Sequence, residues 1–494
     1  MNVSTVSASG LRDEALLRGS AYVDGAWVAE GDSGRFSVEN PSTGEMVADL
    51  PSLSRAQAAE AVAAAHRAWP GWRALSAKDR AGVLRRWFDL VVEHTDDLAR
   101  IITLEEGKPL AEARGEVAYA ASFLEWFAEE AKRVRGDVFP SPGASGRIVV
   151  LKEPVGVCAA ITPWNFPAAM ITRKAAPALA AGCTMVVKPA AQTPLTALAL
   201  AELADRAGVP AGVFNVVVGG AREIGAELTG NPLVRKLTFT GSTEVGRLLL
   251  AQSAETIKKT SMELGGNAPI LVFDDADLDV AVTGVLTAKF RNTGQSCIGA
   301  NRVYVQAGIH DRFAEELAAR VAELAVGNGM EPGSQIGPLI DAAAVAKVEE
   351  HVADATSGGA RVLCGGSRHE LGGQFFQPTV LADVVPGMLV TRQETFGPVL
   401  PIIRFTDEAD AVRMANDTEF GLAAYLFSRD AARTWRVAAA LEAGMVGINT
   451  GYISNEIAPF GGIKQSGLGR EGSVYGVDEY LEMKYLSWEG AGAP

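Results

Sequence analysis

Short apolar stretches alternate with stretches of helical period from about residue 147 to residue 263. The short stretches are rich in β-branched residues and predict strands, whereas the longer ones are rich in Ala and Leu and predict helices. This alternation predicts a parallel sheet with helices on both faces, a Rossmann-like α/β fold whose strand ends bind nucleotides. The expected strands are 147–153, 155–161, 184–188, 214–218, 236–240 and 256–263, and the expected helices are 168–181, 195–207, 222–228 and 244–254.

The segments on either side of this region carry turn and helix-cap signals. An Asp-Gly pair at 24–25 and a turn cluster at 40–44 indicate small β elements. Ser54 caps a helix expected to reach about residue 69, Ser76 caps a long helix to about residue 106, and a third helix covers 110–135. A second α/β run from about residue 269 to residue 478 predicts a second domain that begins near Gly265 and Gly266. Residues 1–20 are expected to form a loose tail.

Composition narrows the class of protein. With 494 residues the chain should hold two or three domains, and its 48% hydrophobic and 21% charged residues are typical of a water-soluble enzyme. The formal net charge of -14 repels nucleic acid and anionic membranes, so neither is expected as a partner. No apolar run reaches about 18 residues without Pro or charge, and the first twenty residues contain no apolar targeting region, which indicates a cytoplasmic protein.

The cysteines and histidines predict no metal site. Four cysteines lie far apart without a C-x-x-C pair, which argues against a zinc site or a disulfide framework. The histidines occur in charged, helix-like or loop stretches with no second ligand at i+3 or i+4, and they are expected at the surface rather than as metal ligands or bases. They are His66, His94, His310, His351 and His369.

The loop at residues 290–302 places Cys297 among small and amide-bearing residues, after a helical pattern and before a strand-like one. A packing cysteine usually has apolar neighbours, so the loop favours an exposed nucleophile, with an inert thiol as the alternative. Asn165 lies in an aromatic segment between two prolines, and its amide is the kind of donor that an oxyanion requires. Glu263, a carboxylate at an apolar strand end, would have its pKa raised toward that of a general base. A structural turn and a hydrogen-bonded strand-end acid are the alternatives for these two residues.

Three further features could hold a phosphate or a ribose. Gly241 and Ser242 follow an expected strand and open an expected helix, so their backbone N–H groups could hold a pyrophosphate, unless they form a plain turn. Lys188 ends a strand and could bond ribose or phosphate, or be an ordinary strand-end charge. The G-x-G-x-x-G match at 467–472 follows no strand, and we interpret it as a loop.

Arg173 and Arg291 are local cations of the kind that an acidic protein needs to hold an anionic substrate. Arg291 lies six residues before Cys297 in the sequence. For either arginine alone, a charge on a surface helix is the alternative interpretation.

Six segments resemble the motifs of the aldehyde dehydrogenase superfamily in order and spacing. They are 163–167, 188–190, 239–242, 262–266, 294–297 and 394–398, and the resemblance runs from about residue 22 to residue 485. Within the superfamily, segments 170–174, 290–295 and 464–472 look most like those of succinate-semialdehyde dehydrogenases.

The resemblance implies a Rossmann-like cofactor domain, a second α/β catalytic domain and a small β oligomerisation arm. Their expected bounds are 21–138 with 159–266, 267–478, and 139–158 with 479–494, respectively. It also implies a homodimer or a dimer-based homotetramer, in which the strands around 147–158 and the tail at 480–488 pair across subunits.

The resemblance further implies a mechanism. Cys297 attacks the aldehyde carbon, and the Asn165 amide and the Cys297 backbone N–H hold the resulting oxyanion. Hydride transfer to the cofactor leaves a thioester, which water activated by Glu263 hydrolyses to the acid. Contacts with the cofactor are implied for Pro163, Trp164, Lys188, Pro189, Ala190, Ala191, Gly241, Ser242, Leu264, Glu394 and Phe396.

The cofactor is expected to be NAD(P). In NAD-preferring members a Glu commonly stands three residues after the lysine and bonds the ribose 2′-hydroxyl. Here that position is Ala191, which carries no charge to repel a 2′-phosphate, so NADP is expected to be accepted and preferred over NAD.

The resemblance implies that Arg173, Arg291 and Ser454 hold the distal carboxylate of a small semialdehyde, with succinic semialdehyde the expected substrate. Tyr452 stands where an aliphatic residue is expected, so glutarate semialdehyde or a broader range of aldehydes is an alternative. Gly299 replaces the second cysteine of some relatives, so their regulatory disulfide should be absent.

The sequence argues against two other classes of protein. A non-enzymatic relative would be expected to have lost Cys297, Glu263 or Asn165, and all three are present. A CoA-acylating dehydrogenase differs in the acceptor of the acyl group, and an available Glu263 favours water.

Overall fold

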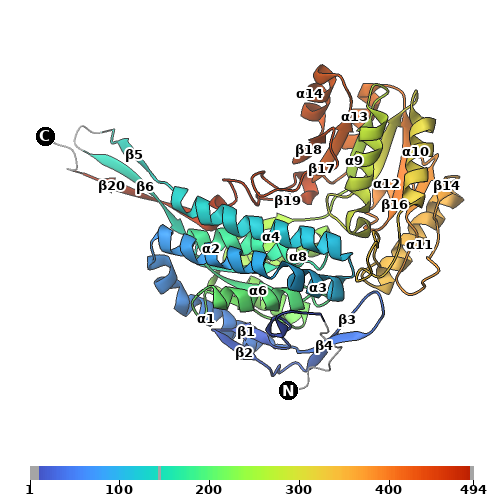
Figure 1. Cartoon of the computed structure of the whole chain (residues 1–494). Helices are drawn as coiled ribbons and strands as arrows, with labels where there is room; N and C mark the ends of the chain where they lie inside the picture. The colour runs from blue at the N-terminus through green and yellow to red at the C-terminus, as the bar shows by residue number, and fades with distance from the viewer. Residues whose placement is uncertain (1–9, 143–145, 490–494) are drawn as a thin grey trace.

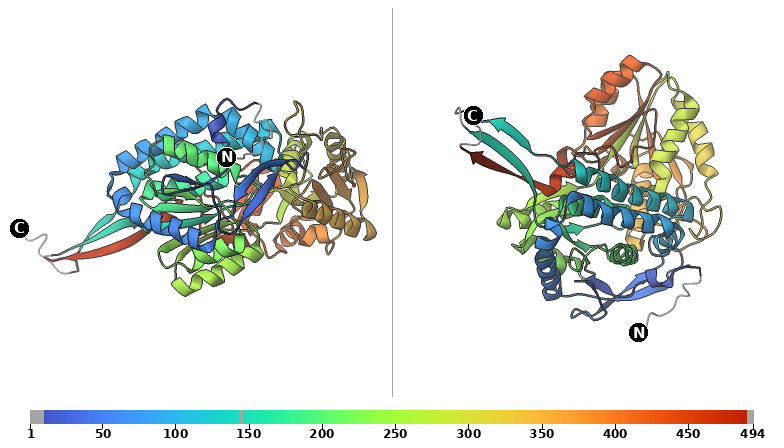
Figure 2. Two further views of the ribbon diagram at one scale, coloured as in Figure 1. Left: turned by 90° about the horizontal axis from the view of Figure 1, so that it is seen from below. Right: turned by 60° about the vertical axis from the view of Figure 1, so that its left-hand side comes forward.

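The computed structural model describes residues 10–142 and 146–489, and most of these belong to two α/β domains that lie side by side (Figure 1). The first is drawn mainly in blue to green and the second in yellow-green to red, and a thin arm extends away from the first (Figure 2). The Rossmann-like and second α/β domains predicted from the alternation of strands and helices are confirmed. Within the described ranges, no helix is long and apolar enough to cross a membrane.

The sheet of the first domain has eight strands in the order β19-β11-β10-β7-β8-β9-β1-β2. Its five central strands are parallel, and the antiparallel strands β1, β2 and β19 lie at its two edges. The parallel strands therefore point their carboxyl ends at one edge, where a dinucleotide binds in such folds. The strands are β1 (Ala21–Val23), β2 (Ala26–Val28), β7 (Val157–Ile161), β8 (Thr184–Lys188), β9 (Phe214–Val216), β10 (Val234–Thr240), β11 (Lys259–Glu263) and β19 (Gly467–Leu468).

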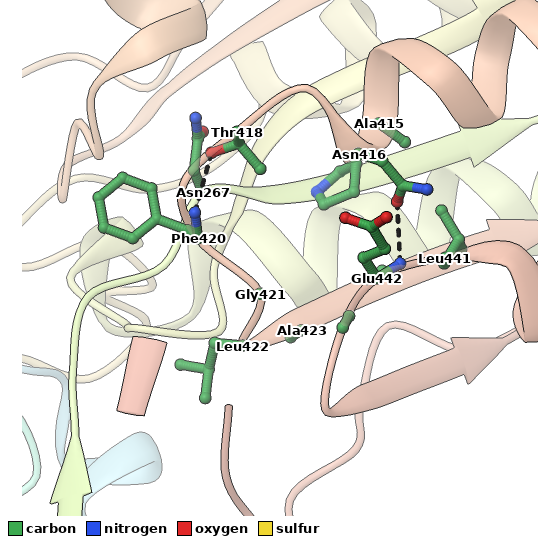
Figure 3. A pocket seen from close by; sticks show the side chains of 13 residues that line it. Asn267, Ala415, Asn416, Thr418, Phe420, Gly421, Leu422, Ala423, Leu441 and Glu442 are labelled. Atoms are coloured by element: carbon green, nitrogen blue, oxygen red, sulfur yellow. Dashed lines mark hydrogen bonds between the residues drawn. The ribbon is translucent and has the colours of Figure 1, made fainter. Parts of the chain in front are cut away.

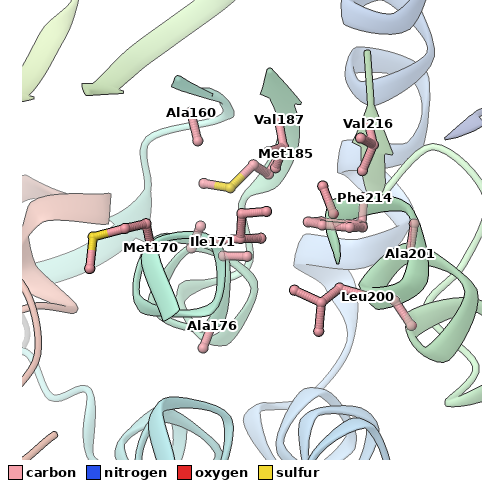
Figure 4. Packing of buried hydrophobic residues seen from close by; sticks show 14 of the residues in the cluster. Ala160, Met170, Ile171, Ala176, Met185, Val187, Leu200, Ala201, Phe214 and Val216 are labelled. Atoms are coloured by element: carbon pink, nitrogen blue, oxygen red, sulfur yellow. The ribbon is translucent and has the colours of Figure 1, made fainter. Parts of the chain in front are cut away.

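Helices cover this sheet and bury its apolar side chains. Figure 4 shows Ile171 and Leu200, from two helices, packed against Met185 of β8 and Phe214 of β9. All four side chains are buried, and burial of each is worth roughly 1.5–3 kcal/mol relative to exposure. The helices are α1 (Arg55–Ala74), α2 (Ala77–Glu93), α3 (Thr95–Glu106), α4 (Leu110–Glu130), α5 (Ala169–Ala181), α6 (Leu195–Arg206), α7 (Ala221–Gly230) and α8 (Thr243–Ser253).

The prediction of one long helix from Ser76 to about residue 106 is wrong. The chain leaves helical geometry at His94, with φ -97° and ψ 21°, and α2 and α3 are separate helices. The His94 ring contacts the carbonyl of Leu90 at 2.9 Å, and the Thr95 hydroxyl donates to the carbonyl of Val92. Side chains that bond the nearby backbone compete with helix continuation, which explains the break.

The prediction that the histidines lie at the surface is wrong for two of them. His351 is fully buried, and its ring nitrogen lies 3.1 Å from the Thr395 hydroxyl. His310 is also buried and contacts the Asp311 carboxylate at 2.8 Å. Both residues lie in helices, on the side that faces the protein interior. Their charged sequence neighbours suggested the solvent-facing side instead. Among the described residues, no group of His, Cys, Asp or Glu side chains could hold a metal ion.

The second domain contains a seven-stranded sheet in the order β14-β15-β16-β13-β12-β17-β18, parallel except where β14 joins. The strands are β12 (Ala268–Val272), β13 (Ala300–Gln306), β14 (Arg361–Cys364), β15 (Thr379–Ala382), β16 (Val399–Phe405), β17 (Ala423–Phe427) and β18 (Met445–Ile448). The helices are α9 (Leu278–Phe290), α10 (His310–Ala322), α11 (Ala342–Ser357), α12 (Leu389–Arg392), α13 (Glu408–Asn416) and α14 (Ala431–Ala440). Cys297 lies in the connection between α9 and β13.

The arm is a three-stranded antiparallel sheet in the order β20-β6-β5 (Figures 1 and 2). Its strands are β5 (Asp137–Pro140), β6 (Arg147–Pro154) and β20 (Leu481–Trp488), and β20 pairs with β6 of the same chain over its whole length. A separate hairpin joins β3 (Arg35–Glu39) to β4 (Met46–Pro51). The arm exposes large apolar side chains, namely Val138, Phe139, Met483, Tyr485 and Trp488.

Candidate active site

Two cavities meet at Cys297. The larger is a cleft that is open to solvent, and the smaller is a pocket that shares Cys297 and Met170 with the lining of the cleft. The cleft is lined by Pro163, Trp164, Asn165, Gly241, Ser242, Leu264, Glu394 and Phe396 among others. The pocket is lined by Tyr119, Phe166, Met170, Arg173, Arg291, Ser296, Ile298, Ser454 and Phe460 in addition to Cys297. A molecule in the pocket can thus present one end to the thiol while a second molecule approaches it from the cleft.

The loop before Cys297 has an unusual backbone. Asn292, Thr293 and Gly294 all lie in the left-handed region, with φ of 51°, 56° and 75°. Such conformations are costly for residues other than glycine and persist only where the surroundings fix them. The backbone N–H of Asn292 donates to the Glu112 carboxylate at 2.7 Å, and the Gln295 amide accepts from the backbone of Ile340 at 2.9 Å.

The loop after Glu263 approaches Cys297 closely. A Cβ added to Gly266 would lie 2.4 Å from the Cys297 carbonyl oxygen, so only glycine permits this contact. The Tyr425 hydroxyl donates to the carbonyl of Ile298 at 2.8 Å and so fixes the backbone immediately after Cys297. The predicted nucleophile is therefore presented by a rigid backbone from both domains.

Cys297 is partly buried and unpaired. Burial raises the pKa of its thiol to about 12; the Arg173 guanidinium opposes this shift, and the carboxylates of Glu394 and Glu263 add to it. The thiol is thus protonated at neutral pH in the free protein, and it must lose its proton to act as a nucleophile.

The Asn165 amide is buried and donates to the carbonyl of Gln295 at 3.0 Å. A side-chain amide carries two N–H groups, so one remains for another acceptor. The carbonyl of Asn165 accepts from the Lys108 ammonium at 2.6 Å and from the Asn292 amide at 2.9 Å, which fixes the segment. This is the rigid donor that stabilisation of an oxyanion requires.

Glu263 ends β11 and is buried, and neither of its carboxyl oxygens has a hydrogen-bond partner among the described residues. Burial raises the pKa of this carboxyl well above its ordinary value, and the charge of Glu471 raises it further, against Arg173 and Lys174. A carboxyl free of hydrogen bonds with a raised pKa suits a general base.

Glu471 contacts a predicted site residue, Arg173, although nothing in the sequence singled it out. Its buried carboxylate accepts from Arg173 Nε and from the Lys174 ammonium, each at 2.5 Å. Burial disfavours the charge of Glu471, but the Lys174 and Arg173 cations outweigh it and hold its pKa below the ordinary value. The segment that we interpreted as a loop is thus a structural part of the site. Its start, β19, pairs with Met262 and Glu263 on β11, so residues 467–468, which we assigned to the second domain, extend the first sheet.

The cleft has the features that a dinucleotide needs at its nicotinamide end. The Trp164 and Phe396 rings meet edge to face at 5.5 Å, and a Cβ on Gly265 would lie 3.1 Å from the Glu394 carboxylate. Burial raises the pKa of Glu394 to about 7, while the backbone N–H of Gly266 donates to it at 3.2 Å. A carboxylate held in this way can accept from ribose hydroxyls.

Ser242 caps α8, which opens onto the cleft, and its hydroxyl accepts from the backbone N–H of Val245. The N-terminus of a helix favours an anion such as a pyrophosphate. A Cβ on Gly241 would lie 2.4 Å from the Phe239 ring, so this turn needs glycine. The backbone N–H groups at the start of α8 and the narrow turn at Gly241 thus suit the phosphates of a dinucleotide.

Lys188, Pro189, Ala190 and Ala191 follow the carboxyl end of β8 and do not belong to the lining of the cleft itself. The buried Lys188 ammonium donates to the carbonyl of Pro189 at 2.8 Å and has no carboxylate partner among the described residues. Burial lowers its pKa to about 8. An acceptor from a ribose or a phosphate would complete its hydrogen bonds.

Arg173, Arg291 and Ser454 come together in the smaller pocket, as expected from the resemblance. Arg291 lies over the rings of Phe166 and Tyr452, at 4.9 and 5.2 Å, and its guanidinium donates to the Ser454 hydroxyl at 3.5 Å. Arg291 forms no ion pair in the described part of the chain, so its positive charge is available to a ligand in the pocket. Its partner Ser454 lies 163 residues away in the sequence.

A separate small pocket in the second domain is lined by none of the predicted site residues (Figure 3). The Lys464 ammonium donates to the carbonyls of Asn416 and Thr418 and pairs with the Glu442 carboxylate. Lys464 thus already satisfies the carbonyls of Asn416 and Thr418 and the carboxylate of Glu442 beside this pocket.

A comparison with known families decides among the classes of enzyme that this site allows. The model of the aldehyde dehydrogenase family matches residues 27–486. The chain belongs to the aldehyde dehydrogenase family. It is accordingly an NAD(P)-dependent oxidoreductase.

Several aldehyde dehydrogenases are similar over nearly the whole chain. A glutarate-semialdehyde dehydrogenase of Pseudomonas aeruginosa is 64% identical over 97% of this chain and 99% of its own length. An NADP(+) succinate-semialdehyde dehydrogenase of Escherichia coli is 63% identical over 96% and 99%. The crystal structure of a succinate-semialdehyde dehydrogenase from Burkholderia pseudomallei is 62% identical, with a TM-score of 0.96 over 97% of this chain and 100% of that one.

The acidity of the two groups gives the aldehyde dehydrogenase a defined pH dependence. Both Cys297 and Glu263 have raised pKa values, and a cysteine nucleophile and a carboxylate general base each need the ionised form, so a larger fraction of both would be ionised at higher pH. We expect kcat/KM to rise steadily between about pH 6 and about pH 9, which initial rates in buffers of constant ionic strength would measure. A rate that falls over this range would contradict these assignments.

Proposed function

We propose that the protein oxidises succinic semialdehyde to succinate, with NADP preferred over NAD. The observation that carries this proposal is the pocket beyond Cys297, where Arg291 has no acidic partner in the described structure and lies beside Arg173 and Ser454. An arginine matches a carboxylate in shape and charge, so the pocket suits an aldehyde with an acidic far end.

In the proposed reaction the Cys297 thiol first loses its proton to solvent, and the thiolate then attacks the aldehyde carbon. The free N–H of the Asn165 amide and the Cys297 backbone N–H donate to the oxyanion that forms. Bound NADP would accept the hydride released as this thiohemiacetal collapses to a thioester. Glu263 then takes a proton from a water molecule, whose oxygen attacks the thioester carbon and frees succinate and the thiol. The proton passes from Glu263 to solvent.

Glutarate semialdehyde is the second candidate substrate. A relative 64% identical to this chain is named a glutarate-semialdehyde dehydrogenase, and one that is 60% identical is named a 3-sulfolactaldehyde dehydrogenase. These names share a small aldehyde with an acidic group. Tyr452, half exposed at the side of Arg291, is the residue whose bulk bears on chain length.

Initial rates with succinic semialdehyde, glutaric semialdehyde and butyraldehyde, each with NAD and NADP and without CoA, test the proposal. We expect the highest kcat/KM with succinic semialdehyde and NADP, and formation of the free acid. Equal rates with butyraldehyde would exclude an acid-selective site, and a requirement for CoA would exclude hydrolysis.

The preference for NADP rests on Ala191, which is exposed at the end of β8. A carboxylate there would repel a 2′-phosphate and could bond a 2′-hydroxyl. We expect Ala191→Glu to lower the ratio of kcat/KM for NADP over NAD by about tenfold or more. The matched control is Gln192→Glu, which adds the same charge at the next exposed position. A tenfold preference of the wild type for NAD would refute the proposed cofactor preference.

We further propose a homodimer or homotetramer assembled through the arm. The exposed apolar side chains of β5 and β20 support this, as do the outer edges of these two strands, which pair with no other strand of the described residues. Pairing of the arm across subunits and the domain bounds given above stay predictions.

A further inference from the structure

The pocket beyond Cys297 contains two buried polar atoms without a partner in the described chain. They are the hydroxyl oxygen of Tyr119 and Nη1 of Arg173. Tyr119 is 8% exposed and its ring packs against Phe123 at 4.9 Å, so the hydroxyl cannot turn to solvent. Buried polar groups in proteins are nearly always hydrogen-bonded, and an unpaired one calls for an explanation.

The neighbours of Tyr119 leave its proton without an acceptor. Arg173 gives Nε to Glu471 and directs another amino group at the Met170 sulfur at 3.2 Å, so it has only donors to offer. Arg291 is likewise a pure donor. No carboxylate lines the pocket, and its other lining groups are hydroxyls, the thiol and apolar side chains. An anionic oxygen of a ligand is the acceptor that this arrangement suits.

The arginines and the tyrosine therefore differ in what they provide. The charge of Arg173 is already balanced by Glu471, whereas Arg291 has no acidic partner in the described residues. Arg291 supplies the net charge that attracts an anion, and Tyr119 and Arg173 Nη1 supply fixed directions for two hydrogen bonds. A bond from a neutral donor to a carboxylate is stronger than one to a neutral acceptor.

We propose that Tyr119 is a specificity-determining residue, whose phenolic O–H donates to the distal acidic group of the aldehyde beside Arg173. This inference rests on the proposed function, because it needs a substrate with an acidic far end. It adds that an uncharged aldehyde is disfavoured, since such a substrate leaves the buried hydroxyl unpaired.

The test is Tyr119→Phe, which removes one oxygen and keeps the ring that packs on Phe123. We expect kcat/KM for succinic semialdehyde to fall about tenfold to a hundredfold, mostly through KM, because the bond forms in both the ground state and the transition state. The value for butyraldehyde should stay the same or rise. A binding readout without turnover is the rise in Tm caused by succinate, which should shrink in the variant.

The melting temperature without ligand separates this role from a structural one. Because the Tyr119 hydroxyl makes no bond within the described protein, Tyr119→Phe should leave Tm unchanged or raise it. Tyr304 offers a matched control, since it is equally buried but its hydroxyl donates to the carbonyl of Met414 at 3.2 Å. Tyr304→Phe should lower Tm and should not alter the ratio between the two aldehydes.

The outcomes distinguish the two proposals. If the wild-type protein shows no preference for succinic semialdehyde over butyraldehyde, the proposed function fails. If the wild type prefers the acidic aldehyde but Tyr119→Phe lowers both activities equally, or lowers neither, the role of Tyr119 is refuted. Selective loss on the acidic aldehyde, with Tm maintained, supports it.

Discussion

Replacing Glu263 by glutamine is expected to leave an enzyme that reacts once and then almost stops. Glutamine keeps the shape of the side chain but cannot accept a proton from water, so the thioester on Cys297 should persist. We expect steady-state turnover to fall by about 10²–10⁴-fold, the usual contribution of a general base. Stopped-flow absorbance should show a burst of reduced cofactor of one equivalent per subunit before this slow phase.

The burst should survive because of the electrostatics around the thiol. The charge of Glu263 is one of the causes that raise the pKa of Cys297, so its removal favours the thiolate. The variant should also be at least as stable as the wild type, because neither carboxyl oxygen of Glu263 makes a hydrogen bond within the described structure.

Asn165→Ala is the control for Glu263→Gln. It removes a donor to the oxyanion and should slow the burst itself, by about 10²–10³-fold. A Glu263→Gln variant that turns over within threefold of the wild type, or that shows no burst, would contradict the role given to Glu263.

Local signals were sufficient for the central strands of the first sheet but not for β19, which we interpreted as part of a loop. Residues 184–188 are β-branched and apolar between two turns, and β8 has these bounds. The break at His94 was missed because the apolar period continues through it, and only the contacts of its side chain with the preceding turn end the helix.

Only some residues of the candidate site could be predicted from their neighbours in the sequence. Cys297, Asn165 and Glu263 each stand at a strand end or in a loop whose neighbours reveal their chemistry. Glu471 has no such signal, because its partner Arg173 is 298 residues away in the sequence and the ion pair exists only after β19 has joined β11. The same holds for Tyr119, an ordinary helical tyrosine until the fold places it beside Arg173.

Arg291→Ala is expected to separate acidic from neutral substrates. The guanidinium forms no ion pair with an acidic side chain of the described chain, and it lies over the rings of Phe166 and Tyr452 at 4.9 and 5.2 Å. Loss of a charged, double hydrogen bond to a carboxylate should lower kcat/KM for succinic semialdehyde by about 10²–10³-fold. Butyraldehyde makes no such bond, and its kcat/KM should change by less than about threefold.

Arg291→Lys separates the contribution of the positive charge from that of the hydrogen-bond geometry. Lysine keeps the charge but lacks the planar guanidinium and its packing on both rings. We expect an intermediate loss on succinic semialdehyde and a steeper dependence on ionic strength, since a mobile ammonium attracts the carboxylate without fixing it. Kinetics at low and high salt with both aldehydes provide the measurement. Equal losses on the two aldehydes in the alanine variant would refute the carboxylate clamp, because a change that merely disturbs the Cys297 loop would slow every aldehyde alike.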